Sequence, residues 1–370
     1  MSSTLRTLRP SGCTSRSAWL WGGLAAIVAT IPVAAGLLPD RVFHIRDLSL
    51  FFWCRHLWLR RALLSGEWPL WDPFAAAGQS AVADALHQMF LLPSVLLRLI
   101  GSERLGFNLW IMAPFPIAAL GMYLYLRSRF STRAAALGAT VFAVSGPVVS
   151  SGNFPNLSWS VAWMPWVLWS VDRCHTTASP GRQLVLVSTM FALQALSGEP
   201  VSLAATAVLA VAHSAVLRPS EDPRLGWRNR IHGTARALIG LALGGLVAAI
   251  QLLPLAAAVA GSWRSAGSTY DFWSLHPLGL VESISVHLFG DYFVSQNFRA
   301  LPWMTPLNSG RDPFFFSIYI GPTALAMALF GAVVGWSRRW GAFWFAAGVM
   351  AIVCAAGPHT PLYPVLRSHL

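Results

Sequence analysis

The chain has 370 residues, of which 55% are hydrophobic and only 11% are charged. Soluble domains carry about 25% charged residues, so this composition excludes an ordinary soluble protein and favours a polytopic membrane protein. The formal net charge is +12, and all 26 basic residues are arginines. We attribute the positive charge partly to a biased composition and partly to the topology, because arginines gather in loops on the cytoplasmic side of a membrane. The charge therefore gives no argument for a nucleic-acid partner.

The N-terminal segment carries three arginines before an apolar run at 18–38. A signal peptide has a similar beginning, but this run lacks a small-residue cleavage site near its end. We therefore expect a retained helix, with residues 1–17 in the cytoplasm and residues 18–370 forming the membrane domain.

A helix of about 20 apolar residues crosses the hydrocarbon layer, because a helix satisfies its own backbone polar groups there. The sequence predicts an all-α polytopic membrane protein with about nine such helices. They are expected near 18–38, 106–126, 134–150, 157–171, 183–197, 201–217, 234–260, 314–336 and 341–357.

The connections between these segments alternate in charge, which predicts their orientation. Arginines occur in the connections 127–133, 171–183, 218–230 and 336–340, whereas 150–159 and 197–200 contain none. Connections rich in arginine stay in the cytoplasm, so we expect a cytoplasmic N-terminus. Two long segments then lie outside, and we call them the first loop (39–105) and the second loop (261–313).

The first loop contains two further apolar segments, 48–64 and 86–100. Segment 86–100 crossing alone would reverse every later connection, and a crossing pair would bury arginines at about 2.5 kcal/mol or more each. We favour helices that lie at the membrane interface. In 48–64 the polar residues Ser49, His56 and Arg60 share one helical face.

Asp47 stands at the start of the first interfacial helix, close after the first apolar run. One interpretation is an acidic residue that caps a helix N-terminus. The other is a general base that takes a proton from an acceptor hydroxyl at the boundary of lipid and water. Its position alone does not separate the two.

Other polar residues also have two interpretations each. Glu199 is either a turn carboxylate at a helix N-terminus or a ligand for substrate. Asp84 and His87 share a helical face and suit a divalent cation or a hydroxyl, although such a pair is common. Arg264 suits a phosphate, but also a side chain that extends toward lipid headgroups.

The segment SGEWPLWDPFAAAGQSAVADALHQMFLLP (65–93) contains Pro-Leu-Trp-Asp-Pro, then a glycine, and then a glutamine before an aromatic residue and proline. This pattern resembles a motif of the YfhO-type bacterial membrane proteins, in which asparagine stands at the position of Asp72. The likeness covers nearly the whole chain and continues in 121–146, 160–173, 197–200, 251–267, 319–331 and 355–366. No single motif decides it, and their order and spacing carry the resemblance.

The resemblance implies a GT-C-type fold in the bacterial cytoplasmic membrane, acting on polyprenyl-phosphate-linked sugars outside the cytoplasm. An acidic residue early in the first outer loop is the usual catalytic candidate of such enzymes, and Asp47 stands at that place. The acceptor is an envelope glycan, lipid or protein, and membrane lipids surround the site. Family members often continue well beyond the TPLY region, whereas this chain ends at Leu370, so a fragment or truncated product is one interpretation.

The resulting hypothesis is an inverting sugar transfer with Asp47 as general base. Arg264, Arg46 or a divalent cation would offset the charge of the leaving phosphate, and no other cofactor is expected. The remaining substrate-binding candidates are His44, Asp84, His87 and Glu199. A lipid or glycolipid transporter is the competing hypothesis, with polar groups on both halves of the membrane and broken helices as its expected signs. A non-catalytic assembly protein of the cell envelope is the third.

Overall fold

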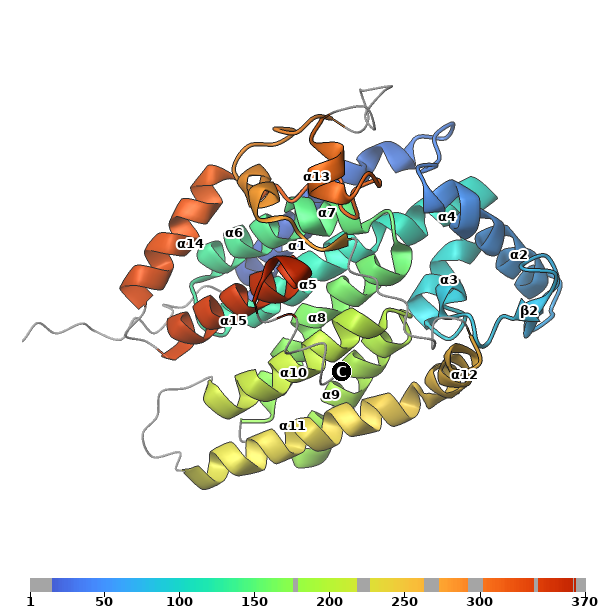
Figure 1. The fold of residues 1–370 in the computed structure, drawn as a ribbon. Helices are drawn as coiled ribbons and strands as arrows, with labels where there is room; N and C mark the ends of the chain where they lie inside the picture. The colour runs from blue at the N-terminus through green and yellow to red at the C-terminus, as the bar shows by residue number, and fades with distance from the viewer. Residues whose placement is uncertain are drawn as a thin grey trace, which may run out of the picture.

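The computed structural model describes residues 15–175, 179–217, 227–262, 273–291, 302–335, 339–361 and 363. These residues form a bundle of α-helices with one pair of two-residue strands (Figure 1). The all-α prediction is therefore confirmed in its coarse form, and the small strand pair is an addition to it.

A helix lies at each of the nine apolar segments of the sequence, although several of them are short or broken. The bundle consists of α1 (Ser15–Thr30) with η1 (Ile31–Leu37), α4 (Glu103–Met112), α5 (Pro114–Arg127), α6 (Thr132–Ala143), α7 (Gly146–Ser151), α8 (Pro155–Arg173), α9 (Pro180–Ala195), α10 (Pro200–Val216), α11 (Trp227–Val247), α12 (Ala249–Ala260), α14 (Pro322–Gly335) and α15 (Arg339–Ala356). Proline is the first residue of five of these helices, α5, α8, α9, α10 and α14, where its missing N–H costs nothing.

Three helical stretches in the described residues are long and apolar enough to cross a membrane: Ser17–Leu37, Glu103–Arg127 and Arg339–His359. A fourth is added if the bent pair Arg230–Val247 and Ala249–Ala260 forms one span. The chain thus has the character of a multi-pass membrane protein, while nine full crossings exceed what length and composition establish.

The break between α6 and α7 shows why a predicted span is interrupted. The backbone N–H of Gly146 donates to the carbonyl of Tyr319 at 2.6 Å, so the two chain segments touch at this point. A Cβ atom on Gly146 would lie 2.5 Å from the backbone nitrogen of Tyr319. Pro147 follows directly and has no N–H to extend the preceding helix. Close approach of a distant segment therefore fixes the break.

The predicted span 234–260 is bent by 71° between α11 and α12. α11 has 21 residues, about 31 Å at 1.5 Å per residue, which is already the thickness of the hydrocarbon layer. In α12, the side chain of Gln251 donates to the carbonyl of Val82 in the first loop at 2.5 Å. The bend thus directs α12 toward the first loop, beside which it lies in Figure 1.

The first loop is folded and lies at one end of the bundle, at the right of Figure 1. Its elements are η2 (Leu48–Phe52), a π-helical turn that continues into α2 (Trp53–Leu64), then β1 (Trp71–Asp72), β2 (Gln79–Ser80), η3 (Ala85–His87) and α3 (Leu92–Leu99). The strands are antiparallel, with Trp71 opposite Ser80. The helices expected at 48–64 and 86–100 are therefore present.

The polar face of α2 points into the protein rather than toward a headgroup layer. His56 is fully buried, and its Nε2 lies 2.9 Å from the carbonyl of Glu103. Arg60 donates to the carbonyl of Arg98 in the last turn of α3 and to that of Gly101 just after this helix, each at 2.5 Å. Arg60 thus satisfies carbonyl groups at the C-terminal end of α3, which explains why this polar side chain turns inward.

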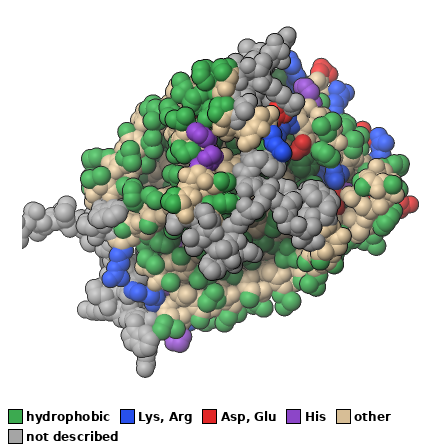
Figure 2. Space-filling model, in the orientation of Figure 1, with side chains coloured by type: hydrophobic (Ala, Val, Ile, Leu, Met, Phe, Trp, Pro, Cys, Tyr) green, Lys and Arg blue, Asp and Glu red, His purple; other side chains and the backbone are tan. Residues whose placement is uncertain are grey.

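The hydrophobic core connects the first loop to the bundle. Phe107, Trp110 and Trp159 are fully buried, and Leu48 and Phe52 belong to the same cluster. Figure 2 shows hydrophobic side chains over most of one face, with acidic and basic side chains gathered toward the right-hand end. The left-hand end shows basic side chains and histidine without visible acidic ones.

Candidate functional site

Asp47 lies at the N-cap position of η2, and its side chain makes no capping hydrogen bond. The carboxylate is partly buried. The structure therefore lacks the capping contact that one interpretation of the sequence predicted. A carboxylate in this setting has free lone pairs to accept a proton or a hydroxyl hydrogen.

Asp47 differs in this respect from the other carboxylates that are partly or fully buried. Within the part of the chain that the structure describes, each of the others has a partner: Asp72 and Asp84 with His87, Glu103 with Arg61, Asp172 with Arg129, Glu199 with the Ser202 N–H, Glu282 with the Phe289 N–H, and Asp291 with His287, while Asp312 also has an interaction. Asp47, the catalytic candidate of the sequence analysis, is thus the partly buried carboxylate without a partner among the described residues.

Arg46 was expected to face a phosphate, but its side chain is engaged within the protein. Its Nη1 donates to the carbonyl of Pro313 at 2.7 Å. Its guanidinium carbon lies 5.5 Å from the ring centre of Phe154 and 5.3 Å from that of Phe316. Arg46 therefore joins the first loop to the end of the second loop. His44 is exposed, and its Nδ1 lies 3.4 Å from the carbonyl of Val42.

Asp84 and His87 meet as their spacing predicted, within a larger buried cluster. Asp84 accepts two hydrogen bonds from Arg55, at 2.8 and 2.9 Å, and one from Gln79 at 3.1 Å. Its Oδ2 lies 3.4 Å from Nδ1 of His87, and Nε2 of His87 lies 3.3 Å from Oδ2 of Asp72. Histidine thus stands between two carboxylates.

This cluster does not suit a divalent cation. Burial alone would raise the pKa of Asp84, but His87 and Arg55 lower that pKa to about 2, so side chains of the protein already supply the positive charge beside this carboxylate. The oxygen Oδ2 that faces His87 already accepts from Arg55 and Gln79. Among the described residues no group of three His, Cys, Asp or Glu side chains is arranged to hold a metal ion. The contacts of Asp84 are instead those of an internal ion pair.

Glu199 acts as a cap, which is the first of its two interpretations. It accepts from the backbone N–H of Ser202 at 2.5 Å at the start of α10. Its turn also packs on η3, since a Cβ on Gly198, whose φ is +83°, would lie 2.5 Å from the carbonyl of Ala85. Arg264 lies outside the described residues.

Sequence reasoning missed Gln88, which is fully buried beside the cluster. Its amide nitrogen donates to the carbonyl of Ser197 at 2.8 Å, and its amide oxygen accepts from Trp110 at 2.8 Å and from Ser94 at 3.0 Å. Gln88 is the glutamine of the 65–93 motif, and that place in the motif was the available signal. Arg98 was missed as well; it is buried, donates to the carbonyl of His87 and lies over the Trp110 ring.

A second buried polar cluster lies where α5, α8 and α10 end. Arg129 and Asp172 form a two-pronged ion pair with distances of 2.5 and 2.8 Å. Nδ1 of His213 lies 3.6 Å from Oδ1 of Asp172, and its Nε2 lies 2.8 Å from the hydroxyl of Tyr125. The sequence analysis placed Asp172 in the arginine-bearing connection 171–183 and did not identify this cluster.

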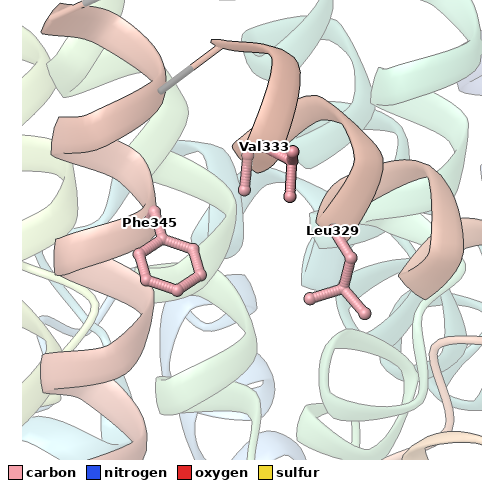
Figure 3. A pocket seen from close by; sticks show the side chains of 4 residues that line it. Leu329, Val333 and Phe345 are labelled. Atoms are coloured by element: carbon pink, nitrogen blue, oxygen red, sulfur yellow. The ribbon is translucent and has the colours of Figure 1, made fainter. Parts of the chain in front are cut away.

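An apolar pocket lies between α14 and α15, lined by Leu329, Ala332, Val333 and Phe345 (Figure 3). No side chain of this lining has a group that takes part in acid–base or nucleophilic chemistry. The pocket therefore suits hydrocarbon and is separate from the carboxylates.

Comparisons with protein-family models, with curated proteins and with solved structures found no match. The resemblance to YfhO-type proteins accordingly stays a prediction, and the functional argument depends on the residues themselves.

Proposed function

We propose that the protein is a membrane glycosyltransferase with a GT-C-type bundle of about nine spanning helices in the bacterial cytoplasmic membrane. It would transfer a sugar from a polyprenyl-phosphate donor to an envelope glycan, lipid or protein. The observation that carries the proposal is the side chain of Asp47, which is partly buried and makes no hydrogen bond or ion pair within the described residues.

In the proposed reaction, Asp47 accepts the proton of an acceptor hydroxyl. The hydroxyl oxygen forms a bond to the anomeric carbon, and the bond from that carbon to the phosphate oxygen breaks, with its electron pair leaving on the phosphate. Attack opposite the leaving group inverts the anomeric configuration.

The proposed orientation puts the first loop outside the cytoplasm, where a lipid-borne head group and a water-borne acceptor meet. The arginines of the connections 127–133, 171–183, 218–230 and 336–340 support this orientation, because short connections rich in arginine stay inside. In a chain whose native cysteines are replaced by alanine, among them the exposed Cys54 of the first loop, a cysteine introduced by Asp47→Cys should react with a membrane-impermeant thiol reagent added outside intact cells. Protection until the membrane is opened would reject the orientation and the transfer with it.

The activity test compares two carboxylates of the first loop. Asp40 is exposed and makes no hydrogen bond or ion pair within the described residues, so Asp40→Asn is the matched control for Asp47→Asn. With labelled polyprenyl-phosphate sugar, loss of a general base should lower kcat by about 10²–10⁴, whereas Asp40→Asn should leave it unchanged. Equal turnover in the two variants, with folding verified by thermal unfolding, would remove Asp47 from the mechanism.

A lipid or glycolipid transporter is the second candidate, and two observations favour it. The α11–α12 pair is bent by 71°, and the buried Arg129–Asp172 pair lies away from the first loop, near the ends of α5 and α8. Broken helices and polar groups at both ends are features of transporters. Purified protein in vesicles would move the labelled lipid between leaflets without forming product if this candidate is correct.

A further inference from the structure

Arg46 has an unusual backbone for an arginine. Its φ is +49°, in the left-handed region that side chains with a Cβ atom disfavour. Such a conformation persists where surrounding contacts hold it, and it is often found next to functional groups. Here the residue that follows directly is Asp47.

Three contacts hold the Arg46 side chain. The carbonyl of Pro313 accepts its hydrogen bond, and the rings of Phe154 and Phe316 lie on the guanidinium. Phe154 also stacks on Phe314, with ring centres 4.8 Å apart and planes 11° apart. A planar cation among aromatic rings uses both its charge and its flat shape, which an ammonium group does not reproduce.

The segment 313–321 is in turn attached to the bundle. Ser317 and Ser150 exchange two hydrogen bonds, of 2.9 and 3.0 Å. The N–H of Gly146 in the bundle donates to the carbonyl of Tyr319, and the N–H of Ile320 donates to the carbonyl of Ser283 in the second loop at 3.0 Å. Arg46 therefore connects the backbone next to Asp47 to a segment that the bundle already holds.

We propose that Arg46 is a positioning residue that clamps segment 313–321 to the first loop and thereby fixes the backbone of Asp47. The clamp itself depends only on the contacts above, and its effect on sugar transfer depends on the proposed function. Arg46 thus acts through Asp47 and does not itself bind the donor phosphate.

The test uses full-length protein in detergent and two readouts. Arg46→Met keeps an apolar side chain of similar length but removes the hydrogen-bond donor and the positive charge. Arg46→Lys keeps a hydrogen-bond donor and the positive charge but lacks the planar guanidinium group. Arg41→Met makes the same change at an exposed arginine six positions from Asp47 and is the control. Hydrogen exchange of the 313–321 amides is measured in all three, together with kcat and KM.

Exchange at Ser317 and Ile320 should rise about tenfold in Arg46→Met, which is the loss expected for one hydrogen bond to a charged group. Arg46→Lys should fall between wild type and Arg46→Met, and Arg41→Met should match wild type. In the transfer assay, Arg46→Met should lower kcat about tenfold to a hundredfold with KM for the donor within about twofold, because a misplaced base slows the chemical step.

Exchange in Arg46→Met equal to that of wild type would overturn the clamp. Raised exchange with unchanged kcat would overturn the positioning of Asp47 while leaving the mechanical link. If wild type itself transfers no sugar, the proposed function fails and the exchange measurement still decides the clamp.

Discussion

Replacement of Gln88 by leucine tests whether this one side chain connects the first loop to the bundle. Gln88 is fully buried and contacts the α9–α10 turn through Ser197, α4 through Trp110 and α3 through Ser94. Leucine has a similar size and no polar atom. The variant would therefore lose the hydrogen bonds without opening a large cavity.

The expected loss follows from the groups that remain. The carbonyl of Ser197 and the indole N–H of Trp110 would be left buried without this partner, at about 1–3 kcal/mol each. The Ser94 hydroxyl is able to rotate toward another acceptor, and the apolar leucine recovers part of the loss. We expect the free energy of unfolding to fall by about 3 kcal/mol.

Denaturant unfolding in detergent micelles measures this difference, and Gln194→Leu is the matched control. Gln194 is equally buried and donates to Ser160 and Thr206, but its amide oxygen has no partner. Leucine there removes an unsatisfied atom together with the bonds, so the loss should be nearer 1 kcal/mol. Equal losses in the two variants would refute the reasoning that Gln88 is special.

Three further predictions concern stability and use the same unfolding measurement. The pKa of Asp84 is about 2 in the folded protein, against an ordinary value of 3.8. The ionised side chain therefore adds about 2 kcal/mol to the free energy of unfolding above pH 3.8, and this addition is lost as the pH falls through 2. In Asp84→Asn the free energy of unfolding should depend less on pH between pH 4 and 2. Gly146→Ala should cost about 1–3 kcal/mol because its Cβ would lie 2.5 Å from the Tyr319 nitrogen, and an unchanged stability would show that the segment yields freely. Arg129→Met should cost about 3–5 kcal/mol by leaving Asp172 buried without its arginine, and adding Asp172→Leu should recover most of that loss.

Local sequence signals identified the helices well. A helix lies at every position where an apolar run predicted one, and α10 begins directly after Glu199, which was expected at a helix N-terminus. The spacing of Asp84 and His87 correctly predicted that they meet, because positions three apart are neighbours on one turn. These features depend on residues close together in the chain.

The errors have a common physical origin in contacts between distant segments. Hydropathy predicted one straight span at 234–260. A hydropathy pattern contains no information on the contact between Gln251 and the first loop, which accompanies the bend. Arg46 was assigned to a phosphate because nothing in the sequence connects it to Pro313, 267 positions away. The inward polar face of α2 was likewise hidden, since only folding brings Glu103 to His56.

The turn between α11 and α12 has a consequence for the shape of the protein in a bilayer. The axis of α12 is bent by 71° from that of α11. α12 therefore widens the bundle at the end where Val82 lies and does not lengthen the path of the chain across the bilayer. Its outward side chains Ile250 and Leu253 would displace lipid from a single leaflet. A body that is broader in one leaflet than in the other acts as a wedge, so we expect it to insert with a preferred direction into strongly curved vesicles and with less preference into flat ones.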